Sequence, residues 1–168
     1  AGAFVVPPLA RDAGLTVNEQ GRILVDEQLR SLSHPDIYAA GDAAYCAAMP
    51  TRMSCAAAFP MGAHAADNLA AQLQGKEQTA FSFGYLIQCI SLGRHEALVQ
   101  VVALDDKPQE KIYTGHLAVL IKELICRGTV WALYIERYLP GLYAWAGAEK
   151  GTPDGRIREL SPDAVRNR

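Results

Sequence analysis

The sequence has no uncharged apolar run of about 20 residues, the length that a membrane-spanning helix needs. Its most apolar stretch, Leu117 to Trp145, is interrupted by five charged residues: Lys122, Glu123, Arg127, Glu136 and Arg137. Charge of one sign is not in excess either, since 16 Lys and Arg stand against 18 Asp and Glu. A general nucleic-acid-binding protein needs a basic face, so this balance argues against that class. With 50% apolar residues, the composition predicts a soluble globular protein rather than a disordered one.

Cysteine is scarce, and its spacing does not suit a metal. The chain has Cys46, Cys55, Cys89 and Cys126, without a C-x-x-C pair. No histidine lies at a zinc-finger offset from a cysteine pair, so we expect no structural metal. Buried free thiols are typical of a reducing compartment, and this predicts a cytoplasmic protein.

A G-x-G-x-x-G loop is also absent, so the sequence contains no such loop for binding the pyrophosphate of a dinucleotide. The sequence begins without Met and without a signal peptide. Residues Ala1 to Pro8 form an apolar run typical of the end of a strand. We therefore expect a fragment of a longer chain. The missing N-terminal half of that longer chain would be the first binding partner of the fragment.

Short elements separated by turn residues are predicted for the first part of the chain. Leu9 to Ala13 can form one or two helical turns, and Arg22 to Val25 is typical of a strand. A second apolar run, Ile37 to Ala40, ends at Gly41-Asp42. An alanine-rich helix follows and ends at Gly75. Proline is tolerated in the first turn of a helix, so Pro60 predicts a start near Phe59.

The remainder of the chain predicts a β-hairpin and helices. The strands are Tyr85–Leu92 and Ala97–Leu104, and a charged loop, Asp105–Glu110, follows them. One helix around Leu117–Ile125 is expected to end at Gly128, and a second to run from Thr129 to Leu139. The fold class is therefore α+β, with domains at residues 1–75 and 76–148 and a polar tail at 149–168.

Two consecutive segments carry a family resemblance. Gly21–Asp26 and Pro35–Ala44 resemble the second FAD-binding signature of the pyridine nucleotide-disulfide oxidoreductase superfamily. The resemblance implies a fragment of an α/β flavoprotein with two dinucleotide-binding domains, in which residues 1–75 are the remnant of the FAD domain. It also implies that Gly41 lets the backbone pass close to the cofactor and that Asp42 binds the ribitol chain. The alternative is a plain strand-turn unit.

The helix that follows is similar to a second part of that family. Phe59–Gly62 looks like the start of the helix whose amino end faces the isoalloxazine ring. Backbone N–H groups and the helix dipole would stabilise negative charge on the reduced flavin there. The resemblance assigns this role to the backbone of Met61 and Gly62, and the alternative is an ordinary buried helix.

The last domain resembles that of type II NADH dehydrogenase-like flavoproteins, through Phe83–Tyr85, Ser91–Arg94 and Ala97–Val99. This resemblance implies an enzyme that passes hydride from NADH or NADPH to FAD and on to a small-molecule acceptor. Respiratory members carry glutamines where this chain has Ala58–Met61, which argues against quinone. Without an apolar helix after Trp145, a peripheral membrane contact receives little support. A redox-active cysteine pair would lie outside this chain, and that option stays open.

Other patterns have less specific interpretations, and no catalytic side chain is assigned. An aromatic stretch suggests core packing or a subunit contact in a homo-oligomer, with substrate stacking as the alternative: Trp131, Tyr134, Tyr138, Tyr143 and Trp145. The rival to an enzyme is a non-catalytic dimerisation or interaction module built on a flavoprotein scaffold. His64 and Asp67 are expected to form a helix-surface pair, with a proton relay as the alternative. Arg94 and Glu96 are expected to pair in solvent at the hairpin tip.

Overall fold

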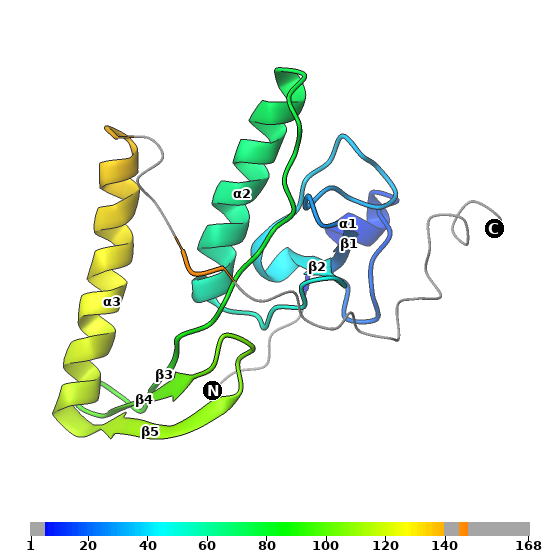
Figure 1. The fold of residues 1–168 in the computed structure, drawn as a ribbon. Coiled ribbons are helices and arrows are strands. Elements are labelled where there is room, and N and C mark those ends of the chain that lie inside the picture. Colours follow the sequence, from blue (N-terminus) through cyan, green and yellow to red (C-terminus); the bar gives the residue numbers. More distant parts are fainter. Residues whose placement is uncertain (1–5, 140–144, 148–168) are drawn as a thin grey trace. The chain divides into compact units, whose positions relative to one another are not determined.

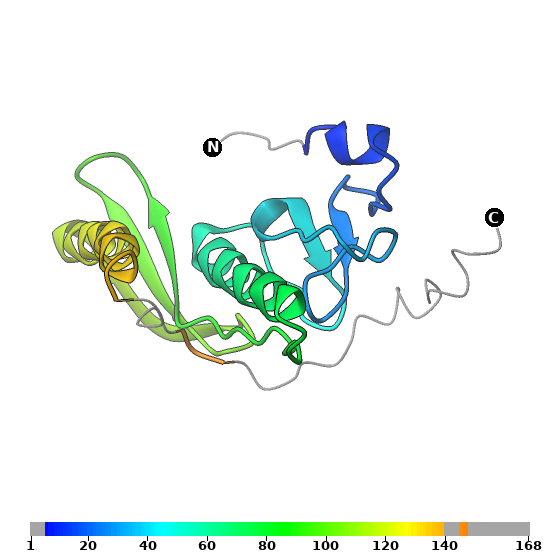
Figure 2. The ribbon, with the colours of Figure 1, turned by 90° about the horizontal axis from the view of Figure 1, so that it is seen from above.

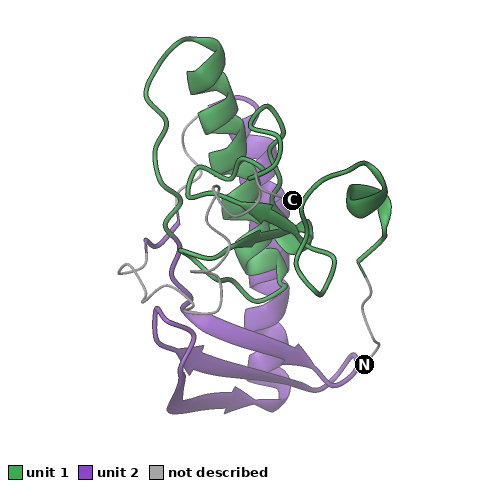
Figure 3. Ribbon diagram, turned by 90° about the vertical axis from the view of Figure 1, so that its right-hand side faces the viewer, with its two compact units in different colours: residues 1–82, 150–168 green, residues 83–149 purple. Residues whose placement is uncertain are grey.

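The computed structural model describes residues 6–139 and 145–147. The fold is α+β, as predicted, with its strands in two separate sheets. The chain divides into two compact units, with the boundary after Ser82 (Figure 3). The segment 76–82 therefore belongs to the first unit, whereas the predicted first domain ends at residue 75.

The first unit contains a short parallel sheet and one long helix (Figure 1). In chain order its elements are α1 (Leu9–Asp12), β1 (Ile23–Val25), the 3₁₀ turn η1 (Gly41–Ala43), β2 (Ala44–Cys46) and α2 (Cys55–Leu73). Strands β1 and β2 are parallel, with Ile23 opposite Ala44. The predicted helical turns at Leu9–Ala13 and the predicted strand at Arg22–Val25 are confirmed.

The run Ile37–Ala40 differs from the pattern that the resemblance implies. Within residues 6–139 it contributes a bridge between Arg30 and Tyr38 rather than a named strand. Its backbone bonds go to a nearby turn, because Ser31 N–H donates to the Ile37 carbonyl at 2.7 Å. The strand at this point follows Gly41-Asp42 instead of preceding it.

Helix α2 begins at Cys55, so the predicted start near Phe59 is wrong. Ser54 caps the helix, and its Oγ accepts from the Ala57 N–H at 3.4 Å. The following residues, Ala56–Ala58, have the highest helix propensity, and Pro60 lies inside the helix, where it removes one backbone hydrogen bond. The predicted stop is confirmed, since Gly75 follows the last turn at φ +66° and Lys76 N–H donates to the Ala71 carbonyl at 2.8 Å.

The segment after α2 is held by buried polar groups of that helix. Asn68 donates to the Thr79 carbonyl at 2.8 Å and accepts from the Thr79 N–H at 3.0 Å. His64 Nε2 lies 2.9 Å from the same carbonyl, and its ring is 5.5 Å from that of Phe81. The predicted surface pair with Asp67 is therefore wrong, because His64 is buried while Asp67 is exposed.

The second unit is a three-stranded antiparallel sheet packed on a long helix. Its elements are β3 (Ile87–Ser91), β4 (Ala97–Val102), β5 (Pro108–Thr114) and α3 (Gly115–Glu136), with strand order β3-β4-β5. The helix packs on the middle strand around Ala97, Val99 and Ala118. Figure 2 shows the helix of this unit beside its strands, seen from above. The predicted hairpin is confirmed, since Ile87 pairs with Val101 and Ser91 with Ala97.

Two predictions for the second unit are wrong. Pro108–Glu110 belongs to strand β5 rather than to a loop. The two predicted helices are one, because α3 runs through Gly128 and the Thr129 Oγ donates to the Ile125 carbonyl at 2.9 Å instead of capping a new helix. A glycine inside a helix costs about 1 kcal/mol of helix stability relative to alanine, which is too little by itself to end a long helix. Neither α3 nor any other helix within the described ranges has the length and apolar character required to cross a membrane.

Candidate functional site: the Gly41-Asp42 turn and the amino end of α2

The η1 turn packs directly against the first turns of α2. Extended backbone at Ala40 is followed by Gly41 at φ +65°, a region that glycine adopts readily. A Cβ at Gly41 would lie 3.2 Å from the Ala58 Cβ, closer than an ordinary van der Waals contact. Gly41 thus permits both the turn and its close approach to the helix.

Asp42 is partly buried in this turn, and only its backbone is engaged within the described residues. Its carbonyl accepts from Arg22 Nε at 3.1 Å. For the carboxylate, the described part of the chain supplies no hydrogen-bond or ion-pair partner. A carboxylate accepts hydrogen bonds strongly, so this side chain can bind hydroxyl groups of a ligand.

Arg22 is a structural determinant of the site that sequence reasoning missed. Only 4% of this residue is exposed, although it carries a charge. Besides the Asp42 carbonyl, it reaches the Thr51 carbonyl with Nη1 at 3.5 Å, and its guanidinium lies 5.4 Å from the centroid of the Tyr45 ring. It therefore ties the Gly41-Asp42 turn to the loop that enters α2.

The amino end of α2 offers two backbone donors. The Ala58 N–H donates to the Ser54 carbonyl at 2.9 Å, and Ala57 is capped by the Ser54 side chain. For the N–H groups of Cys55 and Ala56, no acceptor occurs among the residues that the structure describes. Unpaired N–H groups and the helix dipole make such an end favourable for negative charge.

Met61 and Gly62 lie inside the helix rather than at its amino end. Beyond the first turn, N–H groups bond to carbonyls four residues earlier, so these two amides are engaged in the helix. The Met61 side chain is 1% exposed and its sulfur accepts from Thr51 Oγ at 3.7 Å, which makes it a core residue. Gly62 is exposed, with open space around a Cβ. The structure thus brings Gly41 and Asp42 to the start of α2 and places Met61 and Gly62 farther along it.

The buried cysteine of this unit is less easily deprotonated than a free thiol. Cys46 is buried at the end of β2, where its thiol donates to the Asp26 carbonyl at 3.4 Å. Burial raises the pKa of this thiol above its ordinary value. In residues 6–139 and 145–147, no group of three or more His, Cys, Asp or Glu side chains is arranged to hold a metal ion.

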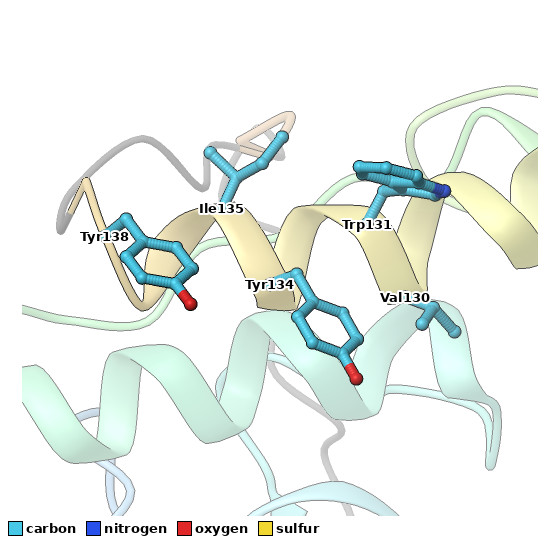
Figure 4. Close-up of a pocket in the computed structure, with 5 residues that line it drawn as sticks. All are labelled: Val130, Trp131, Tyr134, Ile135 and Tyr138. Carbon is cyan, nitrogen blue, oxygen red and sulfur yellow. The ribbon is translucent and has the colours of Figure 1, made fainter.

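In the second unit, aromatic side chains line an open hollow of about 470 Å³ on α3 and the turn after it (Figure 4). Trp131, Tyr134 and Tyr138 are 68%, 63% and 74% exposed. Core packing is therefore wrong for these three, and a subunit contact or ligand stacking remains. Of the other two aromatic residues in this stretch, Trp145 is partly buried and Tyr143 lies outside the described residues.

Comparison with known families bears on the first unit. Residues 1–66 match the family described as pyridine nucleotide-disulphide oxidoreductase. The matched segment contains the Gly41-Asp42 turn and the start of α2, and it ends before the second unit begins. The match supports a relationship to this superfamily of oxidoreductases, whose members generally bind FAD and use NAD(P)H.

Proposed function

We propose that the first unit forms the part of an FAD site that holds the ribitol chain and faces the flavin ring. The intact protein would be an FAD-dependent NAD(P)H oxidoreductase. The observation that carries the proposal is the Gly41-Asp42 turn packed on the amino end of α2, inside the matched segment.

The residues present fit a flavin in two respects. Gly41 holds the turn against α2, where a Cβ would lie 3.2 Å from the Ala58 Cβ, and so places Asp42 beside the start of the helix. Asp42 offers a carboxylate to ribitol hydroxyls, and the N–H groups of Cys55 and Ala56 offer donors and partial positive charge. Once bound, FAD would supply the hydride chemistry, whereas these residues would fix its position and stabilise negative charge on the ring.

The hydride donor would be NADH or NADPH, and the acceptor a small molecule. Assignment to the type II NADH dehydrogenase-like branch is supported by Gly84, which precedes β3. A Cβ there would lie 2.7 Å from a Leu104 methyl and 3.1 Å from the Gly147 carbonyl oxygen, so a larger residue would fit only if these neighbours shifted. A quinone acceptor is disfavoured, because Ala58–Met61 supplies no glutamine.

The proposal can be tested with the 168-residue chain and two flavins. Riboflavin carries the ring and the ribityl chain without phosphate, and FAD adds the pyrophosphate. In the absence of a G-x-G-x-x-G loop, both should bind weakly and with similar affinity, measured by ligand-observed NMR. Asp42→Ala should weaken riboflavin binding by about one to two decades, because a charged acceptor contributes about 1.5–3 kcal/mol.

The matched control is Asp36→Ala, which removes an exposed carboxylate from the His34-Pro35 turn of the same unit. This variant should bind riboflavin like the unmodified chain. Equal riboflavin affinity in Asp42→Ala and the unmodified chain would remove Asp42 from the site. Sub-micromolar FAD binding would contradict the inference from the missing phosphate loop.

A second candidate function, self-association through the last unit, is favoured by one specific observation. The Trp131, Tyr134 and Tyr138 side chains form an apolar exposed surface on α3 and the turn after it, which we name the aromatic face. Large apolar patches on soluble proteins commonly mark interaction sites. A homo-oligomer would cover this face, with or without a catalytic role for the first unit.

A further inference from the structure

A second, polar hollow lies within the second unit, between the tip of the β3-β4 hairpin and one face of α3. Its volume is about 370 Å³, and its lining includes Ser91, Arg94 and Ala97 from the hairpin. From the helix come Val119, Lys122 and Cys126, at spacings that place them on one face. Because Ala97 also belongs to the core cluster with Ala118, the two walls are packed together below the hollow.

Two cationic side chains line this hollow, and neither has an acidic ion-pair partner within the described residues. Arg94 and Lys122 make no ion pair with any residue that the structure describes, so the expected pair between Arg94 and Glu96 is not formed there. Glu123 also lines the hollow, but it is engaged by Arg127 at 2.8 Å. Glu96 is the other nearby acid on the hairpin, and it is exposed. The hollow is therefore lined by two cations that form no ion pair within the described residues.

We propose that this hollow binds a small anion that carries a carboxylate or phosphate group. Arg94 contributes a planar set of donors that suits either group, and Lys122 contributes a compact charge from the opposite wall. The Ser91 hydroxyl donates to the Gly93 carbonyl at 3.1 Å, which leaves its oxygen free to accept from a hydroxyl of the ligand. Ala97 and Val119 supply an apolar floor. This site is independent of the proposed flavin function, because every residue in it belongs to the second unit.

Cys126 provides a built-in reporter, since its thiol lines the hollow and an occupant would shield it. The 168-residue chain is alkylated with neutral iodoacetamide, and labelling rates are measured at each cysteine by peptide mass spectrometry. The probes are succinate and inorganic phosphate, at ionic strength held constant with potassium chloride. Labelling of Cys126 should fall about tenfold when a probe exceeds its Kd about tenfold. Labelling of Cys55, which is exposed in the first unit, should not change.

Variants separate binding from a general salt effect. Arg94→Gln and Lys122→Gln should each abolish the protection of Cys126, whereas Lys111→Gln, an exposed lysine of β5, should retain it. Protection by only one of the two probes identifies the group that the site prefers and supports the proposal. Absence of protection by both probes, equal protection of Cys55, or protection that survives both glutamine variants would overturn it. Circular dichroism of each variant establishes that the fold is retained.

Discussion

Gly41→Ala tests the geometry on which the candidate site rests. The alanine would be held at φ +65°, and left-handed backbone costs an L-residue about 1–2 kcal/mol. Its Cβ would also meet the Ala58 Cβ at 3.2 Å. Neither Cβ can rotate away, and overpacking of this kind adds about 1–3 kcal/mol. We therefore expect a loss of about 2–5 kcal/mol in the free energy of unfolding, measured by urea titration and circular dichroism.

A double-mutant cycle separates these two contributions. Ala58→Gly removes the opposing Cβ but leaves the backbone strain at Gly41→Ala, and by itself it costs about 1 kcal/mol of helix propensity. The double variant should therefore be more stable than the sum of the single changes predicts, by about 1–3 kcal/mol of coupling.

Gly62→Ala is the matched control, because it adds a Cβ to the same helix where nothing lies within 4 Å. It should be neutral or stabilising by up to about 1 kcal/mol. If Gly41→Ala cost less than about 0.5 kcal/mol, or if the cycle showed no coupling, the turn would not pack on α2 as described.

Three further predictions concern other parts of the chain. Arg22→Met should cost about 2–4 kcal/mol in the free energy of unfolding by urea titration, because it leaves buried carbonyls without their charged donor, and Arg22→Lys should recover part of the loss. Gly84→Ala should destabilise the second unit by about 1–3 kcal/mol through overlap with Leu104 and the Gly147 carbonyl. Gly128→Ala should raise the free energy of unfolding by about 0.5–1 kcal/mol, and a decrease would refute a continuous α3. At tens of micromolar, light scattering during size exclusion should detect self-association that Trp131→Glu abolishes, and a monomeric unmodified chain would contradict it.

The elements that sequence analysis predicted correctly have strong local patterns. Strand β1 consists of Ile23–Val25, and the hairpin strands are apolar runs joined by a turn that contains Gly93. Branched side chains favour extended backbone, and Gly75 ends α2 in the conformation that glycine adopts most easily. In these cases the local preference and the tertiary contacts favour the same structure.

The errors occur where a weak local signal competes with its surroundings. Pro60 indicated the first turn of a helix, but Ser54 and the alanines after it form a better start. Gly128 indicated a helix end, yet its backbone does not adopt the left-handed conformation of a terminating glycine. Strand β5 is an edge strand whose side chains are exposed except for a partly buried Tyr113, so it lacks an apolar pattern.

Buried polar residues were the least predictable part of the candidate site. Arg22 precedes an apolar strand and would ordinarily be placed in solvent, and His64 lies on a helix whose neighbouring Asp67 is exposed. Their partners are backbone carbonyls distant in the sequence: those of Asp42 and Thr51 for Arg22 and that of Thr79 for His64. Every residue carries a carbonyl, so side-chain identities do not reveal which carbonyl needs a donor.

The revised start of α2 alters which residues control the proposed flavin contact. The donors at its amino end belong to Cys55 and Ala56, and Ser54 fixes where the helix begins. The Ala58 contact with Gly41 and the tie from Arg22 to Asp42 act on the same few residues. These contacts must hold the turn and the helix together if Asp42 is to bind a ribitol hydroxyl while the N–H groups of Cys55 and Ala56 face the flavin ring. The positioning of the proposed site thus depends on packing at one helix end more than on any single ligand-binding side chain.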